Sequence, residues 1–420
     1  MRKMRCIKKR EYNPNTFGVM INRALVILFL PFLLVSCHLL EELPSHDSCL
    51  DKNSILGVVS ETTISSSLQA YGEELLKNKV GSIVAIDPRT GALLATVSSP
   101  GSDSGLPEKY HPGGDRCFRA GYPAGSVFSI VNGIIGLNDG VLREETEVTC
   151  TKGYVLDNGI KMPCHGHQTV VNLEESVMMN CNTYSYQAFS SIIENPSYES
   201  LDAALEHWKD VVGSLGFGHR IGLSLEGENP GFIPGSLKFQ RTFGSTLNTS
   251  KTALRLAIGE DDILVTPLQL ANFAAIIANR GYYYTPFLST DAQPERIDCG
   301  IARENFSSII RGMWRSANSA PGTGGAAWVT HLDGLDVCAK CGSAANYNGP
   351  DNSVFIGFAP KDNPKIAIAV YIENGGYGAS FAGPIGSLMI EKYSRGYSNR
   401  LDLESHMKDA NLLNRGRYTE

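Results

Sequence analysis

Short apolar runs separated by turn residues occur in two regions of the chain, at residues 80–99 and at residues 337–372. Val80–Asp87 and Leu93–Ser99 are two such runs, and Pro88 and Gly91 between them favour a tight turn, so this segment predicts a β-hairpin. Three further runs predict strands at Val337–Ser343, Ser353–Ala359 and Lys365–Ile372. We expect the hairpin and these distant strands to lie in one sheet, because a hairpin alone is only marginally stable.

Longer stretches with helical periodicity lie mainly between these strands. Thr266 followed by Pro267 is a favoured start of a helix. Similar patterns predict helices at Leu68–Asn78, Val127–Leu137, Leu173–Ser190, Glu304–Asn318 and Phe381–Tyr393. The segment Val155–Thr169, with its glycines and histidines, is expected to be a loop. Cys150 and Cys164 bracket a hairpin-like segment and are a plausible disulfide pair.

The N-terminal region has the pattern of an export signal. Basic residues precede the apolar run Ala24–Ser36, which is short for a membrane span but suits a signal peptide. The run closes with Leu-Val-Ser-Cys at 34–37, which resembles a bacterial lipoprotein box with Cys37 as the lipidated residue. The alternative is an uncleaved anchor over Ala24–Leu40. We therefore expect a lipoprotein signal region (1–37), a tether (38–79), one domain (80–395) and a polar C-terminal tail (396–420).

Composition narrows the class of protein. The chain has 420 residues, 42% of them hydrophobic, and a formal charge of -6, which gives no electrostatic case for binding nucleic acid. Eight of its 10 cysteines lie beyond Cys6 and Cys37. In an exported protein this even number permits disulfides, although their connectivity cannot be read from the sequence.

Ser126 is the strongest candidate for chemistry. It follows the turn residues Pro123 and Gly125 and precedes an apolar, helix-permissive run. Its hydroxyl is therefore placed at a helix start, where unpaired N–H groups and the positive end of the helix dipole converge. A serine there is either a helix cap or a nucleophile.

Three motifs in the order expected for one family decide between these alternatives. Ala-Gly-Tyr-Pro-Ala-Gly-Ser-Val-Phe-Ser at 120–129 resembles the Pro-Pro-Gly-Ser-Thr-Phe-Lys signature of the penicillin-binding transpeptidases, with Ser129 at the position of the lysine. Asn180-Cys-Asn182 resembles the Ser-x-Asn motif, and Lys340-Cys-Gly-Ser343 stands at the Lys-Thr-Gly position. The resemblance extends over roughly Val80–Tyr393.

The resemblance implies an α+β fold in which helices flank a five-stranded antiparallel sheet, with a helical lobe inserted after the first hairpin. It implies that Ser126 is the nucleophile and that Asn182 contacts substrate. Lys340 would attract a substrate carboxylate, Gly342 would let substrate approach the strand, and the N–H groups of Ser126 and Ser343 would form the oxyanion hole. The base is replaced by Ser129 and the proton relay by Asn180.

The resulting expectation is a pseudo-transpeptidase of the bacterial cell envelope, lipid-anchored and facing the periplasm. It would bind peptidoglycan stem peptides or a cell-wall synthesis protein without efficient acyl transfer. Two alternatives remain open: an active serine D,D-transpeptidase or carboxypeptidase with a rearranged base, and a β-lactam sensor. Binding of β-lactams is compatible with all three.

The resemblance implies no cofactor, but one cluster has the chemistry of a metal site. Cys164, His165, His167 and Cys181 combine thiols and imidazoles, which suit zinc, and related transpeptidases carry a histidine close to the cysteine of the second motif. The alternative is a disulfide at Cys164 and histidines in a polar loop. The Cys338-x-x-Cys341 spacing resembles a redox motif, but residues three apart on a strand point to opposite faces.

Overall fold

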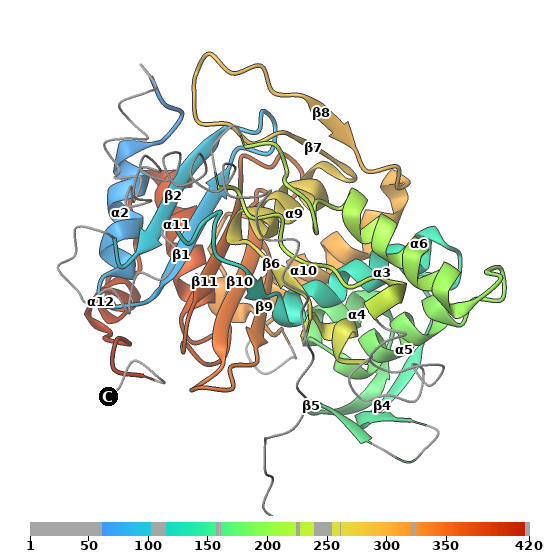
Figure 1. Cartoon of the computed structure of the whole chain (residues 1–420). Coiled ribbons are helices and arrows are strands. Elements are labelled where there is room, and N and C mark those ends of the chain that lie inside the picture. Colours follow the sequence, from blue (N-terminus) through green and yellow to red (C-terminus); the bar gives the residue numbers. More distant parts are fainter. Residues whose placement is uncertain are drawn as a thin grey trace, which may run out of the picture. The chain divides into compact units, whose positions relative to one another are not determined.

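A five-stranded sheet forms the centre of the structure, a computed structural model of the chain (Figure 1). The structure describes residues 61–101, 115–156, 159, 161–223, 227–238, 254–260, 262–320 and 325–415. The predicted lipoprotein signal region lies outside these residues, as does the part of the predicted tether that precedes residue 61. Within the described residues, no helix is long and apolar enough to cross a membrane.

The sheet joins segments from both ends of the domain, as the sequence predicts. Its strand order is β2-β1-β11-β10-β9, and every neighbouring pair is antiparallel. The register Ile83↔Val370 sets the first hairpin beside the C-terminal strands. The strands are β1 (Gly81–Ile86), β2 (Leu93–Ser99), β9 (Cys338–Ala344), β10 (Asn352–Ala359) and β11 (Ile366–Ile372).

Alternation along these strands separates two hydrophobic cores. In β11, Ala367, Ala369 and Tyr371 belong to one core, while Ile368 and Val370 belong to the other. The first core contains the helical lobe, built on α3 (Ser129–Asn138), α5 (Asn182–Ile193), α6 (Leu201–Ser214), α9 (Pro267–Asn279) and α10 (Ser307–Asn318). The second core contains α2 (Ser66–Leu76) and α11 (Ala382–Arg395) (Figure 1).

The remaining elements are short. The small paired strands are β3 (Tyr122–Pro123) with β6 (Leu264–Val265), β4 (Val148–Val155) with β5 (Lys161–Val171), and β7 (Tyr282–Tyr284) with β8 (Arg296–Asp298). The other helical segments are η2 (Gly125–Phe128), α4 (Leu173–Met179), η4 (Leu256–Ile258), η5 (Arg303–Phe306), η6 (Trp328–Thr330) and α12 (Leu401–Asp409).

Both flanks of the predicted domain contain packed helices. Helix α2 lies in the segment expected to be a tether, and its Leu68 and Leu75 are buried in the second core. Helix α12 lies in the segment expected to be a polar tail, and its Met407 is buried there too. The buried carboxylate of Glu391 accepts a hydrogen bond from the guanidinium of Arg400, which precedes α12. Both flanks therefore contribute to the folded body.

The structure confirms some of the predicted local elements and contradicts others. The helix starting at Thr266 is confirmed, with a capping box between Thr266 and Gln269. The single helix expected over Leu173–Ser190 is wrong, because Asn180 adopts a left-handed conformation (φ 58°) that ends α4 before α5 begins. The loop expected over Val155–Thr169 is also wrong, because most of it is strand β5. Cys150 and Cys164 are free thiols, so the expected disulfide between them is not formed.

Candidate active site and a neighbouring thiol cluster

Ser126 lies in η2, a short 3₁₀ turn that leads into α3. Gly125 before it has φ +66°, and its N–H donates to the carbonyl of Gly259 at 2.9 Å. A Cβ at Gly125 would come within 2.5 Å of the Ser343 carbonyl oxygen, so only glycine allows η2 to approach β9 this closely. Ser126 is 8% exposed, and within the described part of the chain its hydroxyl has no hydrogen-bond partner.

Ser129 occupies the position one turn after Ser126. Its hydroxyl donates to the Ser126 carbonyl at 2.8 Å, a local bond within the helix start. The hydroxyl is therefore engaged with the backbone rather than with the Ser126 Oγ. A serine has no proton-accepting group comparable to an amine, so this position supplies no general base.

Lys340 and Asn180 form the polar contact that links the second and third motifs. The Lys340 ammonium donates to Asn180 Oδ1. Lys340 lies on β9 and is completely buried, and this desolvation lowers the pKa of its amine to about 7. The left-handed backbone of Asn180, at the junction of α4 and α5, turns its side chain towards this amine. Lys340 thus has a large neutral fraction at neutral pH.

Asn180 also contacts the β5 strand. Its Nδ2 donates to Nε2 of His165 at 3.2 Å, so one amide group connects the imidazole to the Lys340 amine. Partial desolvation lowers the pKa of His165, which favours the neutral ring whose Nε2 can accept. Asn182, the expected substrate contact, donates to the Pro163 carbonyl at 3.5 Å. The second motif is therefore tied to the β4–β5 hairpin at two points.

The third motif lies directly against η2. A Cβ added to Gly342 would stand 2.9 Å from the Val127 nitrogen and 3.3 Å from the Ser126 nitrogen. Ser343 is paired with Ser353 in the sheet. Ser126, Lys340, Gly342 and Ser343 therefore gather at β9, the edge strand of the sheet, while Asn180 reaches them through Lys340.

Comparison with known proteins assigns this arrangement to a family. Residues 81–391 match the family model described as the penicillin binding protein transpeptidase domain. The chain belongs to this family. The match covers the whole sheet and the helical lobe of the transpeptidase domain, and it agrees with the fold and the motif order.

Several relatives are similar to this transpeptidase domain. The peptidoglycan D,D-transpeptidase MrdA of Acinetobacter baumannii is 29% identical over 356 residues, which is 75% of this chain and 51% of that protein. MrdA of Escherichia coli is 26% identical over 371 residues, or 78% of this chain and 56% of that protein. The chain thus spans about half the length of these curated relatives.

Among solved structures, PBP2 of Pseudomonas aeruginosa in complex with WCK 5153 aligns with a TM-score of 0.67 and 28% identity. The alignment covers 79% of this chain and 75% of that chain. PBP2 of Helicobacter pylori aligns with a TM-score of 0.68 and 23% identity over 80% of this chain and 64% of that one, a likeness of fold.

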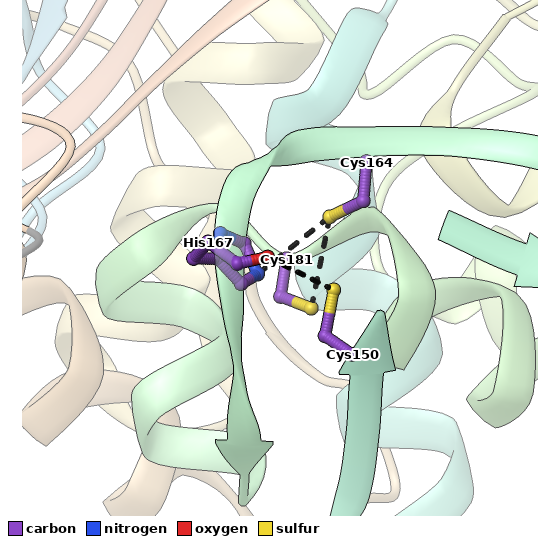
Figure 2. Close-up of side chains that lie close together, drawn as sticks. All are labelled: Cys150, Cys164, His167 and Cys181. Atoms are coloured by element: carbon purple, nitrogen blue, oxygen red, sulfur yellow. Dashed lines mark hydrogen bonds between the residues drawn. The ribbon is translucent and has the colours of Figure 1, made fainter. Parts of the chain in front are cut away.

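A cluster of three thiols and one imidazole lies beside the second motif of the transpeptidase domain. It consists of Cys150 from β4, Cys164 and His167 from β5, and Cys181 at the start of α5; Figure 2 shows the four side chains pointing towards one another. Their possible ligand atoms all lie within 4.8 Å of one another. The sulfurs of Cys164 and Cys181 are hydrogen-bonded at 3.9 Å, and this interaction lowers the pKa of the Cys164 thiol.

The membership of this cluster differs from the sequence-based set. His165, which was included, lies outside the group because its ring contacts Asn180. Cys150, which was assigned to a disulfide, takes part instead. This difference arises from a bulge in the pairing of β4 with β5. Between the pairs Thr151↔Gln168 and Gly153↔Pro163, the four residues 164–167 of β5 lie opposite the single residue Lys152 of β4. This bulge lets both Cys164 and His167 turn inward. The sequence gives no sign of it apart from Gly166 in the Cys-His-Gly-His run.

Proposed function

We propose that this protein is a pseudo-transpeptidase of peptidoglycan synthesis, which binds stem peptides or a cell-wall synthesis protein without efficient acyl transfer. The observation that carries the proposal is the bond from Ser129 to the Ser126 carbonyl. It leaves the Ser126 hydroxyl without a base one turn away, and a weak hydroxyl nucleophile requires such activation. A positioned general base is worth about 10²–10⁴ in rate.

Two structural features around Ser126 support ligand recognition in this proposal. The close approach of η2 to Gly342 does not involve the side chains of Ser129 or Asn180, and the amine of the buried Lys340 is bonded to Asn180. One similar fold, Helicobacter pylori PBP2, has been solved in complex with MreC. A protein partner of this kind is therefore consistent with the proposal.

A rescue series tests the proposal. Ser129→Lys should restore slow acylation by a fluorescent penicillin, because Asn180 still interrupts the proton relay. Ser129→Lys combined with Asn180→Ser should restore more than the sum of the single changes, since catalytic groups act as a unit. Ser126→Ala in the double variant is the matched control and should abolish labelling. Equal labelling of the unmodified protein and the double variant would refute the proposal.

A second candidate function is an active serine acyltransferase that uses Lys340 as its base. The burial of Lys340 favours this candidate, because its pKa of about 7 leaves a neutral amine available near neutral pH. It requires rapid labelling of the unmodified protein at Ser126 and loss of that labelling in Lys340→Met. Labelling to one equivalent without release would instead indicate a β-lactam sensor.

We also propose that a lipid on Cys37 anchors the protein at the envelope, facing the periplasm. The Leu-Val-Ser-Cys run and the basic residues before it support this localisation. Cys37→Ser should block maturation and leave the signal run attached, as measured by the mass of the purified chain. A mature N-terminus elsewhere, without a lipid, would contradict it.

A further inference from the structure

The short strand β3, which leads towards Ser126, is fixed to the central strand of the sheet by one side chain. Tyr371 of β11 is completely buried, and its hydroxyl donates to the carbonyl of Pro123 at 3.2 Å. Its ring stacks on that of Tyr122, with centroids 4.3 Å apart and planes 23° from parallel. Because η2 begins at Gly125, two residues after Pro123, Tyr371 holds the backbone from which η2 starts.

The same hydroxyl is bonded to the neighbouring strand β10. It accepts a hydrogen bond from Nδ2 of Asn352 at 3.1 Å. Asn352 lies two residues from Val354, the register partner of Tyr371, so strand alternation places both side chains on one face of the sheet. In the ladder with β9, Asn352 stands opposite Ala344, which directly follows Ser343. The hydroxyl therefore connects β3 to the part of the sheet that carries the third motif.

The hydrogen bonds continue beyond Asn352 to the segment that follows β9. Oδ1 of Asn352 accepts from the backbone N–H of Asn374 at 3.0 Å, and Oδ1 of Asn374 accepts from Nδ2 of Asn346 at 2.8 Å. Asn346 lies two residues after the end of β9. Tyr371, Asn352 and Asn374 are buried, so water competes little for the bonds between them. A continuous series of hydrogen bonds thus connects β3 with the segment after β9.

These flanking segments enclose the two N–H groups that would stabilise an oxyanion, those of Ser126 and Ser343. The two groups belong to different elements, η2 and β9, which approach each other closely at Gly125 and Gly342. Donors of this kind stabilise a developing charge only when their positions are fixed in advance. The bonds that join the flanks of η2 and β9 supply this fixation.

The hydroxyl of Tyr371 can be tested separately from its ring. Burial raises the pKa of the Tyr371 phenol above its ordinary value, so the hydroxyl keeps its proton and can donate to Pro123 at neutral pH. Tyr371→Phe keeps the ring that stacks on Tyr122. It removes one hydrogen-bond partner from the Pro123 carbonyl and one from Nδ2 of Asn352.

We propose that Tyr371 is a positioning residue of the Ser126 site. Its hydroxyl, together with Asn352, holds η2 against β9 so that the N–H groups of Ser126 and Ser343 face the same oxyanion. This role rests on the proposed oxyanion hole, but it does not depend on whether Ser126 reacts in the unmodified chain.

The first experiment compares hydrogen–deuterium exchange in the unmodified full chain, in Tyr371→Phe and in the matched control Tyr184→Phe. Tyr184 is also buried, and its hydroxyl has no hydrogen-bond partner among the described residues. Amides at 125–129 should exchange at least about tenfold faster in Tyr371→Phe, while amides of α9 and all amides of Tyr184→Phe should not change. Asn352→Ala, which removes the other partner of the hydroxyl, should accelerate the same amides and keeps the test available if Tyr371→Phe does not fold. Unchanged exchange at 125–129, or faster exchange that extends to α9, would overturn the proposal.

The second experiment measures acylation by a labelled penicillin in whichever chain reacts, the unmodified one or the one with Ser129→Lys and Asn180→Ser. This choice separates the failure of the positioning role from the failure of the proposed function. Adding Tyr371→Phe should lower the first-order rate constant of acylation at least about tenfold and change the affinity of the initial complex less than about threefold, since the oxyanion forms only during the reaction. Adding Tyr184→Phe should change neither value. An unchanged rate constant, or a loss of affinity alone, would refute the role, and if neither chain reacts, the exchange at 125–129 decides.

Discussion

The burial of Lys340 predicts a measurable dependence of stability on pH. Its pKa falls from an ordinary value near 10.5 to about 7, because the folded protein removes the amine from water. Between these two values the unfolded chain binds a proton that the folded chain releases. Stability must therefore rise as the pH rises through this window, and it is lowest where the buried amine is charged.

The magnitude follows from this shift. Between pH 7 and pH 9, Lys340 contributes on the order of 2 kcal/mol to the rise in the free energy of unfolding, since each pKa unit corresponds to about 1.4 kcal/mol. Lys340→Met keeps an unbranched side chain of similar length and removes the charge. The variant should thus lose this rise and should be more stable than the unmodified chain at pH 7.

Chemical denaturation of both proteins at several pH values checks this expectation. Lys365→Met at the exposed position preceding β11 is the matched control, and it should leave the dependence on pH unchanged. If Lys340→Met and the unmodified chain showed parallel curves of unfolding free energy against pH, Lys340 would not be a desolvated amine. The role of Lys340 as a partly neutral group beside Asn180 would then be wrong.

Two further substitutions test the packing of the fold, one at the C-terminal flank and one beside Ser126. Glu391→Gln removes a buried carboxylate that pairs with Arg395 and Arg400, and should destabilise the fold by about 3 kcal/mol in denaturant titrations. The more exposed pair of Glu74 with Lys408 provides the control, because Glu74→Gln should cost less than about 1 kcal/mol. Equal losses would contradict the assignment of α12 to the folded body. Gly342→Ala places a methyl group 2.9 Å from the Val127 nitrogen and should cost about 1–3 kcal/mol and weaken β-lactam binding. Gly213→Ala in α6, where nothing lies within 4 Å, should not lower thermal stability and should leave binding unchanged.

The strands of the sheet and most helices could be predicted from the sequence, because short local patterns of apolar, polar and turn residues indicate them. Runs of apolar residues between turn residues predict the strands, and Thr266 with Pro267 predicts the start of α9. The three motifs, by resemblance, predict the fold that joins them. The opposite orientation of Cys338 and Cys341 was also predictable from strand alternation, and the structure places them in different cores.

Details of the second motif depended on tertiary structure. Asn180 is a residue type that tolerates a left-handed backbone, but helical periodicity on both sides of it predicts one uninterrupted helix. The four-residue bulge opposite Lys152 decides that Cys150, and not His165, joins the thiol cluster. Such a bulge depends on how the hairpin packs on α5, and Gly166 alone is too weak a local signal to predict it.

The most direct test of the central claim is the mass of the intact protein after exposure to a penicillin. The purified, unmodified chain is incubated for hours with a labelled penicillin at neutral pH, beside a Ser126→Ala control, and each mass is compared with that of the untreated protein. Without a base at Ser129, Ser126 should carry no covalent adduct, and both chains should keep their original mass. Rapid addition of one penicillin to the unmodified chain and not to the Ser126→Ala chain would contradict the account and identify an active acyltransferase.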